Sequence, residues 1–553
     1  MKLEFEQNVV SEDLFHELDF SSYLSRFDLE LPLLPSVVLH PLSRERGMAH
    51  FERLSRLEQK IDEGKLPLDE LMAQSRKIPS PDYMLSYFES GALEQFQLLT
   101  LGQFVSRELA LQELEKEYPV DEASRESLLS IESSLKMHTT KGFSRLKPDD
   151  GEEQLYKDWQ VIEKELKTKL SQYEREIQEQ TGLKMIYPYP KEILAPSSEV
   201  LFRIQKCRLV SAYETSGVFR VDYRLSEAIE NLDREKNLLE EELEELVAQK
   251  LQRVNEELEP FFLPFRLQVK KRKHRTLDYA LIWVKQQYGL CLPSFHGACH
   301  LSQAVLPVLH RQQREKYVPL DLELRRGANV LHGANMTGKT TVLKTLFFHL
   351  TTIRMGLPVP AASVSMTFPE QVEIHLKTAG SIRRNLSSFG DELHFFTKKM
   401  GENAYILVDE LFQTTDPVSG AKLSSIFLEE FSQKSCFFFC TSHYPEVLDV
   451  PGIRLFRMAD VAIQLETDHD ITVAEWLEKM PFRIEPIDPS QIGEALQTEE
   501  KPLLIALHFP IPESIKLKIR ERMINGRYPR KSGAGRSSEE HGKGNCRRNT
   551  EIH

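Results

Sequence analysis

The sequence predicts an α/β domain in the C-terminal half of the chain, after a mostly α-helical region that contains a small β element. Short apolar runs at residues 404–410 and 436–440 are typical of buried strands. Between Leu155 and Ile177, and again between Leu225 and Leu246, apolar residues recur at steps typical of one face of a long helix. The two kinds of pattern are separated along the chain, with long helices first and buried strands last.

Length and composition indicate a globular protein. With 553 residues the chain has room for about three or four domains. No stretch approaches the roughly 20 consecutive apolar residues that span a bilayer, so we expect a cytoplasmic protein without membrane contact. The six cysteines form neither a CxxC pair nor a dense framework, which argues against disulfides and structural zinc. The net charge of −13 argues against a uniformly basic nucleic-acid-binding surface.

Four ranges follow from shifts in composition. Residues 1–150 are polar and rich in helical patterns, and their role is not apparent. Residues 151–290 predict a helical core or lever, with a small antiparallel strand set at 200–221. Residues 291–525 predict the α/β domain and a C-terminal helical segment. The Gly/Ser/Arg-rich residues 526–553 predict a disordered, basic tail.

Two long amphipathic helices are expected in the second range. The Pro-rich segment 187–190 is expected to end the first helix. In the second helix, leucines stand seven residues apart, but Lys236 and Lys250 interrupt the apolar seam. This pattern fits either a coiled-coil-like pairing or a core helix in a multi-helix domain. A further helical run at 277–289 leads into the α/β domain, after a basic cluster at 270–275 that we interpret as a solvated face.

Residues 333–340 read GANMTGKT and match the phosphate-binding pattern G-x-x-x-x-G-K-[ST]. Glycine allows the backbone to turn its N–H groups toward a phosphate, the lysine reaches the β- and γ-oxygens, and the Thr340 hydroxyl can bind Mg²⁺. A chance match has a prior of roughly one in a hundred. The loop follows an apolar–polar alternation and precedes a helix-like run at 341–349. The expected ATP-binding residues are Gly333, Ala334, Asn335, Met336, Thr337, Gly338, Lys339, Thr340 and Thr341.

Two acids and one histidine complete the predicted site. The apolar run AYILV is followed by Asp409, which would hold Mg²⁺ with Thr340, and by Glu410, which would polarise the attacking water. An ordinary strand that ends in a charged turn is the alternative, at below about one in ten once the upstream loop is considered. His443 follows the next predicted strand and is expected to contact the γ-phosphate or the attacking water. Lys339, Glu410 and His443 are therefore the predicted catalytic residues.

Four segments in this order resemble the MutS family of ATPases, the ABC-related branch best known from DNA mismatch repair. GANMTGKT resembles the family's phosphate loop, NLSSFGDEL (385–393) its signature element, VDEL with TTDPVSGA (414–421) its Walker B motif and D-loop, and CTSHYPEVL its switch-histidine segment. The resemblance implies a P-loop, ABC-type ATPase domain that uses ATP and Mg²⁺. It is strongest over about 300–450 and most similar to the second bacterial MutS subfamily, which lacks mismatch-reading domains.

The resemblance also implies roles for residues outside these motifs. It places Tyr317 where an aromatic side chain stacks on adenine, and Ser387 and Ser388 near the γ-phosphate of a partner subunit in a homodimer. Residues 502–523 resemble the family's terminal helical dimerisation segment. Phe412 and Gln413 replace small or Gly-rich residues, so we expect turnover to be slow or differently gated.

The family resemblance implies a dimeric clamp ATPase that acts on duplex or branched DNA in repair or recombination. A second hypothesis is a MutS-like protein-remodelling ATPase, such as a reactivating factor for a cobalamin-dependent aminomutase, because the chain is acidic and lacks recognisable DNA-reading parts. A degenerate nucleotide-binding scaffold is a third hypothesis. Neither a mismatch-reading Phe-x-Glu domain nor a terminal nuclease domain is recognised, so mismatch recognition and nicking are not expected.

Overall fold

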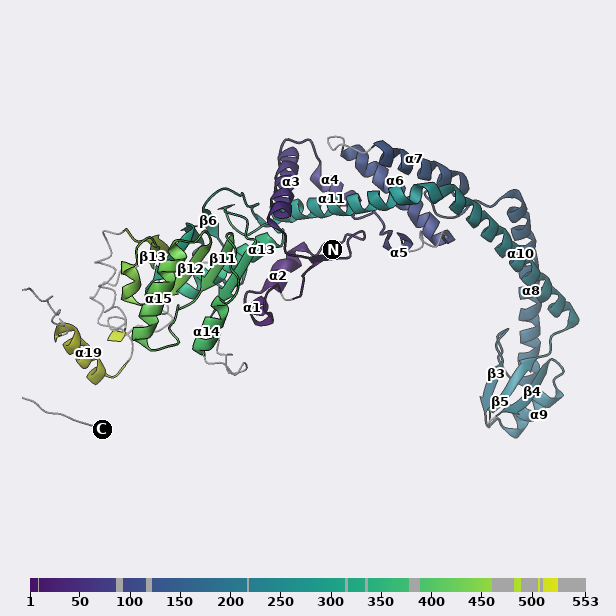
Figure 1. Cartoon of the computed structure of the whole chain (residues 1–553). Coiled ribbons are helices and arrows are strands. Elements are labelled where there is room, and N and C mark those ends of the chain that lie inside the picture. The colour runs from purple at the N-terminus through teal and green to yellow at the C-terminus, as the bar shows by residue number, and fades with distance from the viewer. Residues whose placement is uncertain are drawn as a thin grey trace, which may run out of the picture. The chain divides into compact units, whose positions relative to one another are not determined.

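The chain divides into two compact units. The computed structural model describes residues 1–7, 9–85, 93–115, 122–215, 218–313, 317–333, 337–376, 388–459, 482–488, 506–507 and 511–525 (Figure 1). The first unit takes in Met1–Glu12, Phe20–His40 and Glu52–Gly289, and the second takes in Asp13–Asp19, Pro41–Phe51 and the chain from Leu290 onward. Two short N-terminal stretches thus belong to the unit that the C-terminal half builds.

The body of the first unit is helical. The longest helix of this body, excluding the arm that extends from it, is α11 (Phe262–Tyr288). It contains nearly all of the predicted helical run at 277–289, and its C-cap Gly289 has the left-handed conformation. The helices α4 and α7 pack against α11, and α6 packs against both of them. The other elements of this body are β1 (Lys2–Phe5), α2 (Phe20–Leu24), β2 (Ser36–Leu39), α4 (Leu68–Ser75), α5 (Asp82–Leu85), α6 (Gln95–Leu114) and α7 (Glu122–His138).

An arm of two long helices extends from this body. α8 (Asp150–Thr181) and α10 (Glu227–Leu258) lie side by side (Figure 1). The Trp159 indole donates to Glu240 at 3.0 Å, and Lys250 pairs with Glu152 at 3.0 Å, so the two helices run antiparallel. The two helices therefore pair with each other, and α10 also packs against α7 of the helical body, so features of both expected arrangements are present. Lys250 interrupts the apolar seam, but it is buried, and its charge is paired with carboxylates.

A small sheet lies at the end of the arm. It has the order β3–β5–β4 and is antiparallel, with strands β3 (Lys191–Leu194), β4 (Val210–Thr215) and β5 (Val218–Tyr223). The prediction of strand at 200–206 is wrong, because these residues form α9 (Ser198–Lys206), whose N-cap Ser197 accepts a hydrogen bond from the Val200 amide. The prediction that residues 187–190 end the first helix is also wrong, because α8 ends earlier, at Gly182 with φ 75°.

Arg272 is fully buried, although the sequence interpretation placed it on a solvated face. Its guanidinium forms ion pairs with Glu108 and Glu115, which are also fully buried. Gln268 donates to Glu108 at 2.7 Å, and the Tyr279 hydroxyl donates to Glu115 at 2.7 Å. Burial raises the pKa of Glu108, but the Arg272 charge and hydrogen bonds outweigh it and hold the pKa below its usual range.

The second unit contains an α/β fold, as the sequence predicts. Its six-stranded sheet has the order β10–β11–β12–β8–β13–β14, and all neighbours are parallel except the antiparallel edge pair β13–β14. The strands are β8 (Gly327–His332), β10 (Gln371–His375), β11 (Ala404–Val408), β12 (Phe437–Ser442), β13 (Arg454–Met458) and β14 (Ile484–Pro486). The helices are α12 (Pro307–Gln312), α13 (Lys339–Arg354), α14 (Ser388–Phe396), α15 (Pro417–Ser432) and α19 (Glu513–Asn525).

Two further elements complete the second unit. A three-stranded antiparallel sheet has the order β7–β6–β9, with β6 (Cys299–Ala304), β7 (Leu320–Leu324) and β9 (Ser363–Ser365). The N-terminal stretches contribute most of α1 (Glu12–Glu17) and the first turns of α3 (Arg44–Asp62). The five described cysteines are free. Within the described ranges, no helix combines the length and the apolarity that membrane crossing requires.

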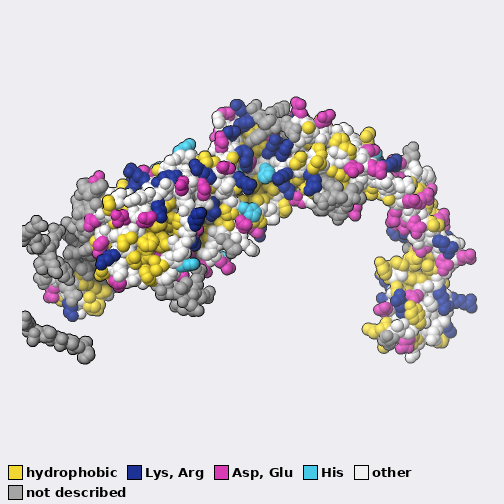
Figure 2. Space-filling model, viewed as in Figure 1, with side chains coloured by type: hydrophobic (Ala, Val, Ile, Leu, Met, Phe, Trp, Pro, Cys, Tyr) yellow, Lys and Arg dark blue, Asp and Glu magenta, His cyan; other side chains and the backbone are white. Residues whose placement is uncertain are grey.

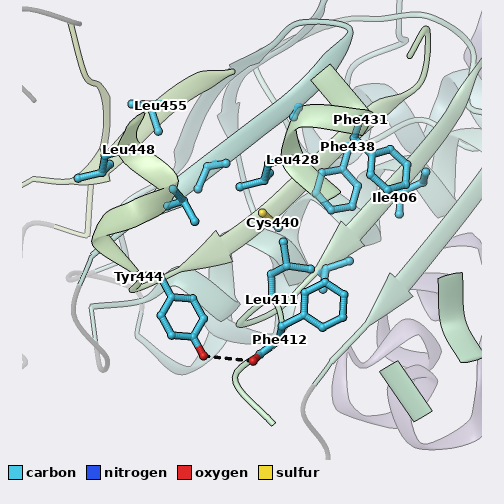
Figure 3. Packing of buried hydrophobic residues seen from close by; sticks show 14 of the residues in the cluster. Ile406, Leu411, Phe412, Leu428, Phe431, Phe438, Cys440, Tyr444, Leu448 and Leu455 are labelled. Atoms are coloured by element: carbon cyan, nitrogen blue, oxygen red, sulfur yellow. Dashed lines mark hydrogen bonds between the residues drawn. The ribbon is translucent and has the colours of Figure 1, made fainter. Parts of the chain in front are cut away.

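An aromatic core packs between the large sheet and α15 (Figure 3). Phe431 and Phe438 stack at 4.3 Å between ring centroids, and Phe412 lies 4.7 Å from Phe427. The Tyr444 hydroxyl donates to the Phe412 carbonyl at 3.1 Å (Figure 3). Gly420 leaves room for this contact, since a Cβ there would lie 2.4 Å from the Tyr444 hydroxyl oxygen. This core fixes the segment that follows β11.

We expect Arg272→Ala to lower the free energy of unfolding of the first unit by about 3–5 kcal/mol, because it leaves the buried Glu108 carboxylate without its cation and leaves Glu115 paired with Arg275 alone. Lys270→Ala is the matched control, since Lys270 is exposed on the same helix. Urea denaturation followed by circular dichroism measures both variants. Equal denaturation midpoints for the two variants would show that the buried network contributes no stability.

Candidate nucleotide site

The phosphate loop lies between β8 and α13, so the predicted strand–loop–helix order is observed. The helix begins at Lys339 and ends at Arg354, and is therefore longer at both ends than the predicted run. Gly338 has φ 97° and Gly333 has φ 149°, and side chains strongly disfavour such angles. Ala334, Asn335 and Met336 lie outside the described residues. The first-turn N–H groups of α13 provide the positive end of a helix dipole, which favours an anion.

Lys339 is buried beside the loop. Its side chain is 5% exposed, and its ammonium donates to the Gly333 carbonyl at 2.7 Å. Burial lowers the pKa of Lys339 to about 8, although the carboxylates of Glu410 and Asp409 raise it. The ammonium is therefore largely charged at pH 7, and a bound phosphate would favour the charged form further.

Asp409 joins three elements through its carboxylate. The Thr340 hydroxyl, from α13, donates to one carboxylate oxygen at 2.7 Å, and the Thr441 hydroxyl, from β12, donates to the other at 2.8 Å. Asp409 itself follows β11 and is 8% exposed. A hydroxyl and a carboxylate are hard oxygen donors, and Mg²⁺ usually takes one or two carboxylates together with phosphates and waters. Thr340 and Asp409 therefore fit Mg²⁺.

The described parts of the chain contain no group of three or more His, Cys, Asp or Glu side chains arranged to hold a metal ion.

Glu410 is held in a strained backbone conformation. It has φ 54° without being glycine, and its amide donates to the Thr441 hydroxyl at 2.7 Å. Phe412 has φ 52°, and its amide donates to the buried carboxylate of Glu392 at 2.6 Å. The Gln413 amide donates to the Glu410 carbonyl at 3.1 Å. The segment after the two acids is therefore a fixed turn.

A cavity of about 380 Å³ extends from the phosphate loop. Lys339, Thr340 and Glu410 line it, and Tyr317, Leu309 and Val342 line it as well. The Tyr317 hydroxyl accepts a hydrogen bond from the Leu306 amide at 2.8 Å, which holds the ring in place. The cavity thus combines charged groups suited to phosphates with an aromatic and aliphatic wall suited to a base.

The remaining predicted residues are placed as follows. His443 follows β12 and is half-buried, with its ring 4.4 Å from the Tyr444 ring. Ser387 lies outside the described residues. Ser388 begins α14, and its side chain is also outside what is described. The roles of these two serines toward a partner subunit stay predictions.

His332 is a site residue that the sequence analysis missed. It is 6% exposed, and its Nδ1 has no hydrogen-bond partner among the described residues. It pairs in register with Ser442, the residue before His443. Burial, and then the charges of Lys339 and His443, lower the pKa of His332 to about 4, so the imidazole is neutral at pH 7. The available signal was a polar residue that ends an apolar strand directly before Gly333.

Comparison with known protein families agrees with this geometry. Residues 329–481 match the family described as MutS domain V. This part of the chain is a MutS-type ATPase domain. The match covers most of β8, the phosphate loop, both acids and His443, whereas the wall of the cavity that contains Leu309 and Tyr317 lies before it in the sequence.

The chain is also distantly homologous to bacterial proteins named endonuclease MutS2. It is 28% identical to that of Fusobacterium nucleatum over 215 residues, which are 38% of this chain and 25% of the relative. It is 33% identical to that of Aquifex aeolicus over 160 residues, which are 28% of this chain and 21% of the relative. The putative endonuclease MutS2 of Bacillus subtilis is 31% identical over 186 residues, or 31% and 23% of the two chains. The chain thus spans a quarter or less of these relatives.

We expect His332 to make the second unit sensitive to acid. The pKa of His332 is about 4 when folded and about 6.5 when unfolded, so the unfolded state binds more protons between these values. The free energy of unfolding is therefore highest above pH 6.5, where His332 is neutral in both states. It decreases by up to about 3 kcal/mol as the pH falls toward 4, because protonation of His332 favours the unfolded state.

The measurement is the unfolding free energy of the wild type minus that of His332→Gln, taken between pH 7 and pH 4. This difference should fall with pH, whereas His296→Gln, at an exposed histidine of the same unit, should give a flat difference. A flat difference for His332→Gln as well would show that the imidazole protonates freely in the folded chain.

Proposed function

We propose that this chain binds ATP and Mg²⁺ in the cavity beside β8 and hydrolyses the ATP to ADP and phosphate. The observation that carries the proposal is one cavity lined by Lys339, Thr340, Glu410 and Tyr317, with Asp409 bound to the Thr340 hydroxyl beside it. The family match supports it, because MutS domain V is an ATPase domain.

Each residue has a separate task in this proposal. Lys339 binds the β- and γ-phosphate oxygens, and Tyr317 stacks on the adenine. Thr340 and Asp409 hold Mg²⁺, which neutralises charge on the phosphates when bound. Glu410 accepts a proton as a water oxygen attacks the γ-phosphorus and the bond to the β–γ bridging oxygen breaks. Thr441 aligns the two acids, since its hydroxyl donates to Asp409 and accepts from the Glu410 amide.

We infer a homodimer in which Ser387 and Ser388 of one copy approach the γ-phosphate bound by the other, while His443 contacts it within its own copy. The family resemblance supports this arrangement. The α19 helix, within the proposed dimerisation segment, exposes Ile515 and Leu517 by 46% and 55%, and a second copy could cover these apolar side chains.

We further propose a clamp that acts on duplex or branched DNA in repair or recombination. In this plan residues 151–290 form the core and lever, residues 291–525 the ATPase and dimerisation part, and residues 526–553 a basic tail, while residues 1–150 have no assigned role. Support comes from the long α8–α10 arm and from relatives that are named endonucleases. ATP binding at paired sites would change the geometry of the arms.

A protein-remodelling ATPase, such as a reactivating factor for a cobalamin-dependent aminomutase, is the second candidate. One observation favours it: the exposed face of α10 carries Glu241, Glu242, Glu244 and Glu245, and acidic side chains gather on the arm (Figure 2). Such a surface repels a DNA backbone and suits a basic protein surface.

We expect Glu410→Gln to slow ATP hydrolysis by about 10²–10⁴-fold, the usual contribution of a general base, while ATP affinity changes little. Steady-state phosphate release and fluorescent-nucleotide binding measure the two effects. Glu429→Gln, at an exposed position on α15, is the matched control and should keep wild-type turnover. Unchanged hydrolysis in Glu410→Gln would remove Glu410 from the catalytic role.

Binding to DNA decides between the two candidate functions. Fluorescence anisotropy with homoduplex, mismatched and four-way-junction DNA is measured across salt concentrations, with and without ATP, because phosphate contacts make affinity salt-dependent. For a clamp we expect nucleotide-dependent binding that stimulates hydrolysis. Hydrolysis that is indifferent to every DNA would instead support a protein client.

A further inference from the structure

A second cavity, of about 420 Å³, lies in the same unit as the nucleotide site. Three arginines line it, together with a wall of apolar side chains, and it shares no lining residue with the nucleotide cavity. Its charged and large apolar lining residues are Arg44, Met48, Phe295, Arg325, Arg326 and Phe368.

Arg326 brings a fixed and uncompensated charge to this cavity. Its guanidinium donates to the Glu402 carbonyl at 3.1 Å and to the Asn403 side-chain oxygen at 3.0 Å, and its carbon lies 5.2 Å from the Phe437 ring centroid. These partners are neutral. Within the described residues no carboxylate forms an ion pair with Arg326. The guanidinium also donates to the Ser435 carbonyl and the Thr367 hydroxyl, which are neutral as well. The side chain is therefore held in place and contributes a positive charge to the cavity rather than free N–H groups.

Arg44 and Arg325 add two further charges. Arg44 begins α3, is exposed, and has no ion-pair partner within the described parts of the chain. The side chain of Arg325 is 71% exposed and reaches a carboxylate oxygen of Glu323 only at 4.0 Å. That carboxylate is bound more closely by Arg454, at 2.9 Å. Three guanidinium groups with little compensation thus face one cavity, in a chain whose net charge is −13.

The apolar wall of the cavity combines packed phenylalanine rings with an exposed methionine. Phe368 is 1% exposed, and its ring lies 5.4 Å from the Phe295 ring. Gly47 allows α3 to pack directly on Phe368, because a Cβ at Gly47 would lie 2.0 Å from that ring. Met48, one residue further along α3, is 38% exposed. The cavity therefore presents flat and flexible apolar groups next to its cations.

We propose that this second cavity binds the phosphate of a nucleotide unit, with the sugar or base against Met48 and Phe295. Guanidinium groups bind phosphate oxygens in pairs, and three of them match a group that carries up to two negative charges. The cavity volume falls within the range of about 300–1,000 Å³ that small-molecule sites occupy. The nucleotide unit can come from a nucleic-acid strand or from a free nucleotide.

The test uses full-length protein with Lys339→Met, which silences the phosphate loop. The probes are a short fluorescein-labelled single-stranded DNA and a fluorescent ADP. Arg44→Gln with Arg325→Gln removes two cations from the cavity. We expect this pair to weaken probe binding at least about 10-fold, and to reduce the slope of log affinity against log salt by about 1–2. Arg46→Gln is the matched control, because Arg46 is exposed on the same helix outside the cavity.

The two probes distinguish the source of the phosphate. Arginine-dependent binding of the single strand alone assigns the cavity to nucleic acid, and arginine-dependent binding of the fluorescent ADP assigns it to free nucleotide. The proposal is overturned if neither probe binds, or if the double variant binds as the Arg46→Gln control does. The double variant should keep wild-type ATP hydrolysis when Lys339 is intact, since neither arginine lines the first cavity. Failure of this proposal is thus separate from failure of the proposed ATPase function.

Discussion

The carboxylate of Asp409 is the constraint on which the rest of the nucleotide site depends. Thr340 and Thr441 each donate to one of its oxygens, so the start of α13 and the end of β12 are fixed to the end of β11. The Thr441 hydroxyl in turn accepts from the Glu410 amide, which orients the second acid relative to the first. Buried charge-assisted hydrogen bonds of this kind are strong and mutually dependent. The position of both acids therefore follows from the parallel pairing of β11, which they follow, with β12, which carries Thr441.

The turn after the two acids shows why a departure from a family pattern can be structural. Phe412 is fully buried, and its ring packs against Phe396 and Phe427 in the aromatic core. Its amide is held by Glu392 and its carbonyl by Tyr444, so the chain keeps a positive φ that a side chain normally disfavours. The large side chain is thus an anchor for the turn that presents Glu410. The prediction that turnover is altered stays a prediction, since packing alone does not set a rate.

Features that depend on residues close together in the sequence could be predicted. Features that depend on contacts between residues far apart in the sequence could not. The phosphate loop, the strand before Asp409 and the two arm helices follow from local spacing. The burial of Arg272 could not be predicted, because its partner Glu108 lies 164 residues away in sequence. The same limit hid His332, and it hid the packing of residues 41–51 on the second unit, where Gly47 meets Phe368. The residues next to a basic residue or a glycine in the sequence do not indicate which distant residue it contacts, and that contact decides its role.

The distribution of charge constrains any nucleic-acid contact more sharply than the net charge does. The exposed face of α10 is acidic, whereas Arg44, Arg325 and Arg326 face one cavity with little compensation from carboxylates. Charges are screened over a Debye length of about 8 Å at physiological salt, so a bound phosphate responds mainly to the charges nearest to it. A phosphate backbone is therefore repelled along this face of the arm and attracted at the arginine-lined cavity. If the chain binds DNA, electrostatics favour a contact on the unit that contains the candidate nucleotide site, where DNA binding and the proposed hydrolysis can be coupled directly.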